Sequence, residues 1–244
     1  MPHPYNNEQL LEFLLTAPCT LAGQFVNSSN YTFFLTIETP YGDIKAVYKP
    51  VRGETPLWDF PTGTLSKREV AAFILSERLG WHIVPHTVFR RKKLPFGKGS
   101  VQYFIDHNPN RHYFNLTKQE KERLKPIALF DCLINNADRK GSHILQGDDG
   151  GVYCIDHGIC FHVEDKLRTV IWDFAGQPIP YDYIQSLRGL LPDIEPDGQL
   201  FNALKDYLRK SEIKALAARA RRLIEDGKFP VPINDRRQFP WPPV

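Results

Sequence analysis

The sequence lacks the features of secreted and membrane-spanning proteins. Its four cysteines form no C-x-x-C pair and lie inside apolar stretches, which is typical of buried free thiols in a reducing compartment. No segment approaches the roughly 20 consecutive apolar residues that span a bilayer. The first residues show no basic stretch followed by an apolar run. We therefore expect a cytoplasmic protein without integral membrane association.

A strong excess of charge of one sign is also lacking. The 244 residues include 31 basic and 28 acidic side chains, and the formal net charge is +3. That excess is too small to favour nucleic acid, although it is compatible with a small anionic ligand such as a nucleotide. The chain has no internal repeat, and its length suffices to bury a full core in one domain. We therefore predict an ordinary globular domain that does not bind nucleic acid.

The N-terminal part of the chain predicts mostly antiparallel sheet. Apolar residues at helical spacing favour a helix over 7–15, which Pro18 ends. A second helix is predicted over 66–79, with Gly80 as the residue after its end. Apolar alternation and polar turns predict strands over 20–26, 31–38, 43–49, 84–90 and 99–105.

The remainder of the chain is predicted to be mainly helical. Helices are expected over 117–135 (split or restarted by Pro126), 183–190, 198–208 and 211–226. Two short strand-like pieces, 143–146 and 152–155, lie between these helices. The predicted fold class is α+β, with the two-lobed outline of a protein-kinase-like domain. We expect one domain over 1–244, with an N-lobe of about 1–105, a C-lobe of about 106–230 and an extended surface tail over 231–244.

Two acidic residues at the ends of apolar segments suit phosphoryl transfer. Asp138 follows the predicted helix 117–135, and Asp156 follows the strand-like piece 152–155. Phosphoryl transfer needs one carboxylate that orients the attacking hydroxyl and another that holds a metal ion at the phosphate. The alternative is structural, with Asp138 capping a turn and Asp156 beginning a loop. Their spacing, with a lysine upstream, favours the chemical interpretation.

The segments around these carboxylates resemble those of a known enzyme family. Residues 129–145 together with 155–161 are similar to the catalytic and metal-binding loops of the phosphatidylinositol 3/4-kinase superfamily, above all the type II phosphatidylinositol 4-kinases. The loop is also similar to that of HipA-type kinases. The likeness covers about 23–161 and suggests a compact bacterial-type member. It implies catalytic or metal-binding roles for Asp138, Arg139 and Asp156.

The resemblance extends to the two strands that contact ATP in that family. The strand that ends in Val47–Pro50 is similar to the strand bearing the ATP-contacting lysine, which here is Lys49. The segment 100–105 resembles the hinge strand, whose backbone meets adenine. The hinge residues implied are Gln102, Phe104 and Ile105.

Lys49 needs an acidic partner, and the predicted helix 66–79 offers two. Glu69 is the expected ion-pair partner of Lys49. A competing interpretation is a capping box, in which Glu69 binds the backbone N–H of Ser66. Glu77, about two turns later, is then the alternative partner. We favour Glu69 because the resemblance adds to the spacing.

The turn 27–30 occupies the position of a phosphate-covering loop, and Ser28 and Ser29 are the candidate phosphate ligands. It lacks the glycines of the usual G-x-G-x-x-G loop, so the backbone is less free to approach a phosphate. Type II phosphatidylinositol 4-kinases likewise use a serine-rich loop. The alternative is a plain hairpin turn.

His143 departs from the resemblance. Kinases of this kind normally place an asparagine five residues after the catalytic aspartate, where it binds the second metal ion. An imidazole is a softer ligand than an amide oxygen, and Mg²⁺ prefers oxygen. His143 is therefore either a metal ligand with an altered preference such as Mn²⁺, a contact to phosphate or acceptor, or the mark of a weakened kinase.

The leading functional hypothesis is an ATP-dependent kinase. It requires ATP, Mg²⁺ or Mn²⁺, and an unidentified hydroxyl acceptor, which is a small molecule, a lipid head group or a protein. The alternatives are a nucleotide-binding pseudokinase, a nucleotidyl (AMP) transferase on the same fold, and an α+β domain whose two carboxylates are structural. Oligomeric state is not predicted.

Overall fold

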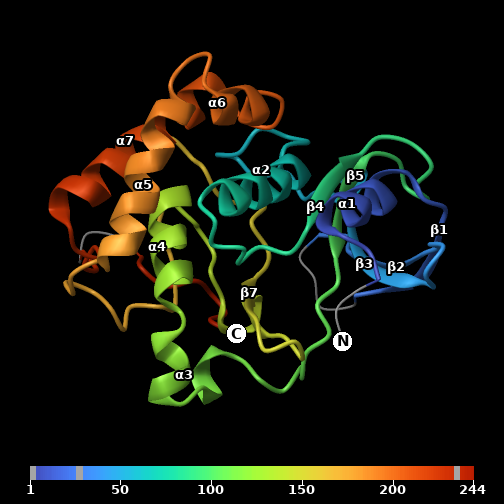
Figure 1. Ribbon diagram of the computed structural model, residues 1–244, viewed down its shortest axis with the longest axis horizontal. Coiled ribbons are helices and arrows are strands. Elements are labelled where there is room, and N and C mark those ends of the chain that lie inside the picture. Colours follow the sequence, from blue (N-terminus) through green and yellow to red (C-terminus); the bar gives the residue numbers. More distant parts are fainter. Residues whose placement is uncertain (1–3, 26–29, 234–236) are drawn as a thin grey trace.

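An antiparallel sheet of five strands forms one side of the molecule (Figure 1). The computed structural model describes residues 4–25, 30–233 and 237–244. In order across the sheet, the strands are β1 (Cys19–Gln24), β2 (Phe33–Ile37), β3 (Ile44–Pro50), β5 (Gly99–Tyr103) and β4 (Thr87–Arg90). All five predicted strands are confirmed. β4 begins three residues later than predicted, because Pro85 has no backbone N–H to give to a ladder.

Helix α1 (Asn7–Thr16) covers one face of this sheet and confirms the first predicted helix (Figure 1). Its N-cap residue is Asn6, which forms a capping box with Gln9. Its inward residues Leu10 and Leu14 are buried with apolar residues of the strands. The sheet and α1 therefore share a hydrophobic core of their own.

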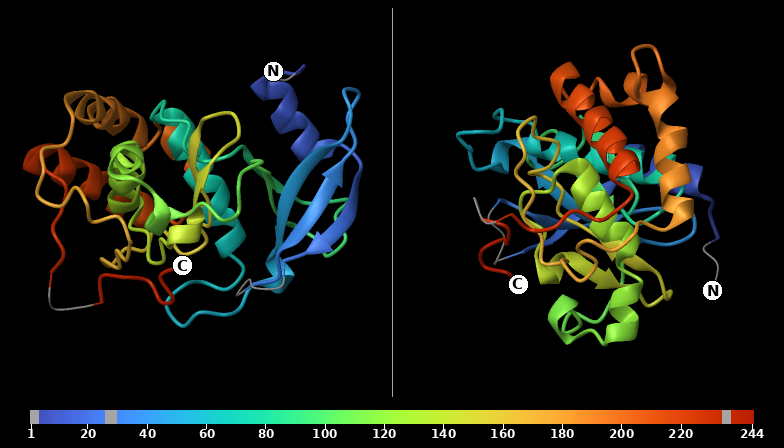
Figure 2. Two further views of the ribbon diagram at one scale, coloured as in Figure 1. Left: turned by 90° about the horizontal axis from the view of Figure 1, so that it is seen from below. Right: turned by 90° about the vertical axis from the view of Figure 1, so that its left-hand side faces the viewer.

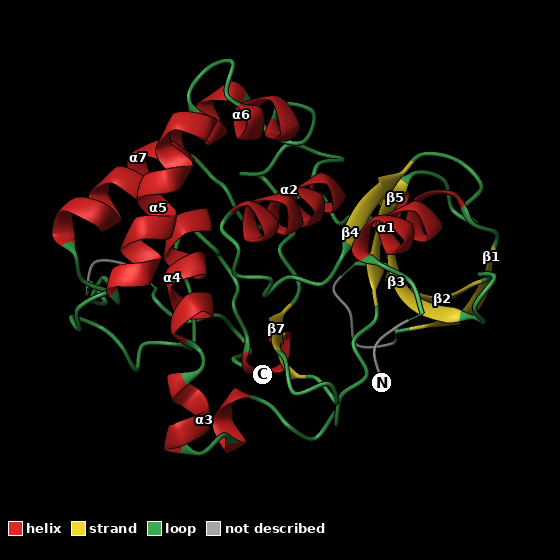
Figure 3. Cartoon of the chain, in the orientation of Figure 1, coloured by secondary structure: helices red, strands yellow, loops and turns green. Residues whose placement is uncertain are grey.

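Helix α2 (Leu65–Arg78) lies between the sheet and the helical side of the molecule (Figure 3). Gly80 adopts a φ of +69° after its end, as predicted for the residue beyond a helix C-terminus. Its buried residues Ala71, Phe73 and Leu75 belong to the core of the helical lobe rather than to that of the sheet. Helix α2 is thereby fixed to the larger lobe while it faces the sheet.

The larger lobe is built from helices around a small hairpin. The helices are α3 (Lys118–Glu122), α4 (Lys125–Ile134), α5 (Tyr181–Ile194), α6 (Gln199–Leu204) and α7 (Lys210–Asp226). Strands β6 (Ile144–Gln146) and β7 (Val152–Cys154) pair antiparallel as predicted. Short 3₁₀ turns stand at η1 (Val51–Gly53), η2 (Tyr113–Asn115) and η3 (Gly141–His143). Pro126 lies in the first turn of α4, so it restarts the helix.

Two helices and the tail differ from their predicted extents. Helix α5 is longer than 183–190, because the buried stripe continues to Ile194. Helix α6 ends at Leu204, four residues before the predicted end. In the described part of the tail, Gln238 is buried and is 8% exposed. The tail is therefore partly packed into the lobe.

Candidate active site

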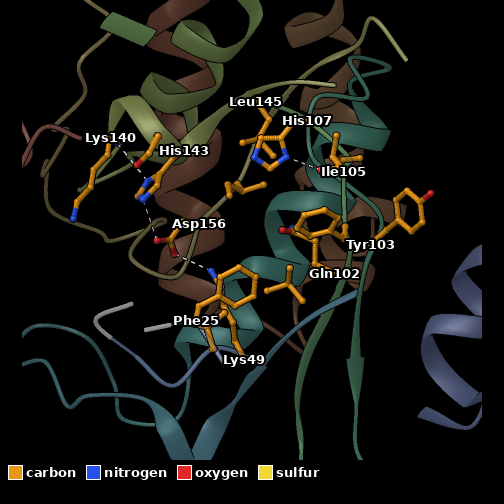
Figure 4. Close-up of a pocket in the computed structure, with 15 residues that line it drawn as sticks. Phe25, Lys49, Gln102, Tyr103, Ile105, His107, Lys140, His143, Leu145 and Asp156 are labelled. Carbon is orange, nitrogen blue, oxygen red and sulfur yellow. Dashed lines mark hydrogen bonds and ion pairs between the residues drawn. The ribbon is translucent and has the colours of Figure 1, made fainter. Parts of the chain in front are cut away.

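A cavity of about 410 Å³ opens between the sheet and the β6–β7 hairpin (Figure 4). One wall comes from β3 and the end of β5, and the opposite wall comes from η3, β6 and the residues after β7. Most residues predicted for the site line it, namely Lys49, Gln102, Phe104, Ile105, His143 and Asp156. Segments far apart in the sequence thus meet at one cavity.

Lys49 projects from β3 and binds two carboxylates at once. Its ammonium forms an ion pair with Glu69 of α2 and lies 2.9 Å from Oδ1 of Asp156. Although desolvation opposes the charge, the carboxylates of Asp156 and Glu69 raise the pKa of Lys49. Lys49 is therefore a fixed cation that links the sheet to the loop after β7.

Glu69 is the partner of Lys49, and the competing capping box does not form. The carboxylate of Glu54 instead accepts the backbone N–H groups of Leu65 and Ser66, at 3.1 and 2.8 Å. The other candidate partner, Glu77, lies 2.9 Å from Nδ1 of His82. Glu69 is almost fully buried, so its charge is directed at the site rather than at solvent.

The hinge segment leaves the sheet immediately after β5. The Phe104 N–H still donates to the carbonyl of Lys45 at 3.0 Å, and beyond it the chain turns along the cavity. The side-chain amide of Gln102 donates to Thr87 at 2.8 Å, and Ile105 is buried. The side chain of Gln102 thus supports the wall of the cavity.

Asp138 stands beside the cavity, in the loop that follows α4. The C-cap residue of α4 is Asn135, whose φ of 55° is a left-handed conformation that asparagine tolerates. The side chain of Asn136 then accepts the backbone N–H of Asp138 at 2.9 Å. Oδ2 of Asp138 lies 3.6 Å from Nζ of Lys140, which lines the cavity. Burial, together with the charge of Asp156, raises the pKa of Asp138 to about 6.

Arg139, predicted to be catalytic, faces the interior and not the cavity. Its guanidinium binds both carboxylate oxygens of Asp131, at 3.0 to 3.1 Å, and both side chains are completely buried. It also donates to the carbonyl of Ile155 at 2.6 Å and lies 2.9 Å from Nε2 of His157. These contacts fit a positioning role, because they join the Asp138 loop to the Asp156 loop.

Asp156 and His143 lie next to each other at one end of the cavity (Figure 4). Asp156 has a φ of 62°, an uncommon conformation for a residue other than glycine. Nε2 of His143 lies 3.3 Å from Oδ2 of Asp156. Burial lowers the pKa of His143 to about 4, so its ring is neutral near pH 7. Nδ1 accepts the Lys140 N–H at 3.4 Å, so Nε2 carries the proton of the neutral ring on the side that faces Asp156.

The donor set suits a divalent cation that shares its shell with phosphate. Within the described part of the chain, no group of three or more His, Cys, Asp or Glu residues could hold a metal ion by itself. Mg²⁺, however, is usually bound by one or two carboxylates together with phosphate oxygens and waters. The side chain of Asp156 is 48% exposed. Although desolvation opposes the charge, the ammonium of Lys49 holds the pKa of Asp156 well below its usual range. The carboxylate is ionised and accessible, which fits such a shared site.

Ser28 and Ser29 lie outside the described residues. The segments on either side of them are described, and both reach the cavity. Phe25 and Thr32 line it, and the Phe25 N–H donates to the Thr32 carbonyl at 2.9 Å. The role of the two serines stays a prediction.

Two charged residues of the site were missed in the sequence. Lys140 lines the cavity beside Asp138, and its position two residues after that aspartate is the signal that could have found it. Asp131 holds Arg139, and the signal was an acidic residue inside the apolar run of α4. A charged residue in an apolar helix usually marks a buried ion pair.

The tail contacts the loop that bears Asp138 (Figure 2). The Gly141 N–H donates to the carbonyl of Pro243 at 2.7 Å. The carbonyl of Gln238 accepts the Thr169 N–H at 3.1 Å and Nε1 of Trp172 at 3.3 Å. The C-terminal segment therefore covers one side of the loop that bears Asp138.

The fold is that of a kinase. It is similar to the Golgi casein kinase with Mn/ADP bound (TM-score 0.57, 17% identity, 91% of this chain and 76% of that chain). It is also similar to hydra Fam20 with sugar (TM-score 0.58, 15% identity, 90% and 87%). The Helicobacter pylori proinflammatory kinase CtkA gives a TM-score of 0.52 at 12% identity, over 88% of this chain and 94% of that chain. At these identities the likeness concerns the fold alone.

The chain belongs to the phosphatidylinositol 3- and 4-kinase family, whose sequence profile matches residues 62–210. It is 39% identical over 258 residues to Protein Rv2133c of Mycobacterium tuberculosis, covering 91% of each chain. It is 30% identical over 122 residues to phosphatidylinositol 4-kinase gamma 4 of Oryza sativa subsp. japonica, which is 43% of this chain and 22% of that protein. Family and fold together support a kinase-type phosphotransferase. Within the described ranges, no helix is both long and apolar enough to cross a membrane.

Proposed function

We propose that the protein is an ATP-dependent kinase that transfers the γ-phosphate of ATP to a hydroxyl group of an acceptor. The observation that carries this proposal is that Lys49 and Asp156 meet at one cavity, where Glu69 also binds Lys49 and Asp138 lies beside it. Phosphoryl transfer needs a cation on the phosphates, a metal-holding carboxylate and a carboxylate at the acceptor hydroxyl. In this protein Lys49, Asp156 and Asp138 are the proposed residues for these three roles, in that order.

The residues take distinct roles in this proposal. Adenine lies against the hinge at Phe104 and Ile105, and Lys49 binds phosphate oxygens. Asp156 holds Mg²⁺ or Mn²⁺, which when bound neutralises charge on the phosphate oxygens. Asp138 accepts the proton of the attacking hydroxyl, and its pKa of about 6 suits a base that works near neutral pH.

The likeness to a kinase crystallised with Mn/ADP supports a nucleotide and a divalent metal as ligands. The two lobes, about 1–105 and 106–230, are proposed to act as one domain with the tail 231–244. The acceptor is a small molecule, a lipid head group or a protein hydroxyl. Its class is left to the experiment below.

Nucleotide binding is the first test. Isothermal titration with ATP and Mg²⁺ or Mn²⁺ should show one site, and Lys49→Met and Asp156→Asn should weaken it. Glu77→Gln is the matched control, because Glu77 lies on the same helix as Glu69 but pairs with His82 outside the cavity. An affinity that is the same in wild type, Lys49→Met and Asp156→Asn would contradict the proposed site.

Transfer is the second test. ATP labelled at the γ-phosphate or at the α-phosphate is incubated with a panel of lipids, small alcohols and proteins. We expect label from the γ position in one acceptor class, and its loss in Asp138→Asn. Label from the α position would instead support nucleotidyl transfer.

One observation favours a second candidate function. His143 lies 3.3 Å from Asp156, at a position where a metal-binding asparagine is usual in such kinases. A nucleotide-binding pseudokinase would bind ATP in the first test and transfer no label to any acceptor in the second. Restoring the amide with His143→Asn would then be expected to raise phosphate transfer from the baseline.

A further inference from the structure

His107 lies just beyond the hinge and lines the same cavity as Ile105 and Leu145 (Figure 4). Its Nδ1 is 2.7 Å from the carbonyl oxygen of Ile105. A carbonyl oxygen can only accept a hydrogen bond, so Nδ1 must carry the proton. In the neutral ring Nε2 then presents a lone pair, which is an acceptor and not a donor.

The ring is held in this orientation from several sides. The backbone of His107 forms an antiparallel bridge with Gly147, and the Asp148 N–H donates to the carbonyl of Asp106 at 2.9 Å. The ring also packs against Phe104, with centroids 5.8 Å apart. The acceptor position of Nε2 is therefore set by the protein before any ligand arrives.

Among the residues that the structure describes, the hydrogen bond of the His107 ring runs through Nδ1 and leaves Nε2 available to a ligand. In Figure 4 the ring lies between Ile105 at the hinge end and His143 at the phosphate end of the cavity. In a nucleotide the sugar joins the base to the phosphates, so it must cross the middle of such a cavity. The hydroxyl groups of that sugar are the donors that reach this region.

We propose that Nε2 of His107 accepts a hydrogen bond from a ribose hydroxyl of the bound nucleotide, so that the site prefers ribonucleotides to deoxyribonucleotides. This inference rests on the proposed nucleotide site and adds a sugar-specificity residue to it. A neutral hydrogen bond contributes modestly, so loss of the hydroxyl should weaken binding about threefold to tenfold.

The test compares dissociation constants for ATP, 2′-deoxyATP and 3′-deoxyATP, measured by isothermal titration with Mg²⁺ on the full chain. We expect wild type to bind one deoxy analogue about threefold to tenfold more weakly than ATP. His107→Asn keeps a donor where Nδ1 meets Ile105 but removes the acceptor, so its discrimination should vanish. His107→Gln places an amide oxygen near the Nε2 position and should retain part of the discrimination between ATP and the deoxy analogue.

His82→Asn is the matched control, because His82 is exposed and pairs with Glu77 away from the cavity. It should keep the wild-type ratio of dissociation constants. Equal binding of ATP and both deoxy analogues by wild type would overturn the inference while leaving the kinase proposal intact, and so would full discrimination in His107→Asn. Absence of any ATP binding would overturn the kinase proposal itself, and the inference with it.

Discussion

Two networks of charged side chains lie on either side of the loop after β7, and they differ in their access to solvent. One joins Arg139 to Asp131, and both side chains are completely buried. The other joins Lys49 to Glu69 and Asp156, and it opens onto the cavity, where the side chain of Asp156 is 48% exposed. We call them the sealed network and the open network.

This difference in exposure suggests a structural role for the sealed network and a ligand-binding role for the open network. In the sealed network, protein groups satisfy both oxygens of Asp131, so no position is left for a ligand. In the open network, Lys49 and Asp156 contact each other across a cavity large enough for a ligand to exchange for one of the partners. The two networks share one segment, because Arg139 donates to Ile155 next to Asp156. The sealed network therefore holds the backbone on which the open network acts.

The largest effect is expected from opening the sealed network. Arg139→Met leaves the charge of Asp131 buried and unpaired, so we expect a loss of about 3–5 kcal/mol in the free energy of unfolding. Urea denaturation followed by circular dichroism measures it. The double variant Arg139→Met, Asp131→Leu removes both charges and should recover much of the loss. A single variant as stable as wild type would show that the buried pair does not hold this loop.

A substitution in the open network is expected to have a smaller effect, which concerns activity and not stability. Glu69→Gln keeps the shape of the side chain but loosens Lys49, and a small misplacement of a catalytic group can cost about 10²-fold in rate. We expect a loss of that order in γ-phosphate transfer, with little change in the melting temperature. Glu77→Gln, on the same helix, should retain the wild-type rate. Equal losses in both variants would contradict the pairing of Glu69 with Lys49.

Much of the open network could be predicted from the sequence. Lys49 and Asp156 each end an apolar strand-like run, and Glu69 stands at the right distance along a predicted helix. Such signals are local, because strand alternation and helix spacing depend on neighbouring residues. The choice between Glu69 and Glu77 needed the fold, since only the burial of α2 decides which face of that helix meets the sheet.

Only one member of the sealed network, Arg139, was predicted from the sequence as a site residue. Arg139 was placed in the site by its neighbour Asp138, but its direction depends on Asp131 and Ile155, which are brought to it by tertiary packing. The contact of the tail with Gly141 was invisible for the same reason, because it joins segments about a hundred residues apart in sequence. The sequence therefore does not predict the orientation of a side chain when that orientation depends on contacts with residues distant in sequence.

Asp138 lies between the two networks and belongs to neither, which gives a pH test. Its pKa is raised to about 6, so the folded state disfavours its charged form. A carboxylate with a raised pKa costs no stability below its unfolded value near 4, and destabilises the fold progressively as the pH rises through about 6.

Asp138→Asn should therefore be more stable than wild type by about 1–2 kcal/mol at pH 8, and no more stable at pH 4. Thermal unfolding across this range measures it. The kcat/KM of wild type should rise with pH through about 6, because the base must be deprotonated. An advantage of the asparagine variant that is the same at both pH values would contradict the raised pKa.

The smallest effect on stability is expected at the start of α2, the helix that carries Glu69 of the open network. Glu54 caps α2 from outside the helix, since its carboxylate accepts the N–H groups of Leu65 and Ser66 and lies 2.8 Å from the Ser66 hydroxyl. Glu54→Ala should lower the free energy of unfolding by about 1 kcal/mol, as the loss of a helix cap does. Glu54→Gln keeps an oxygen acceptor and should lose less. Because Glu69 lies beyond the capped turn, nucleotide affinity in Glu54→Ala should change less than in Glu69→Gln. A larger change in Glu54→Ala would mean that the cap, and not the burial of α2, sets the position of Glu69.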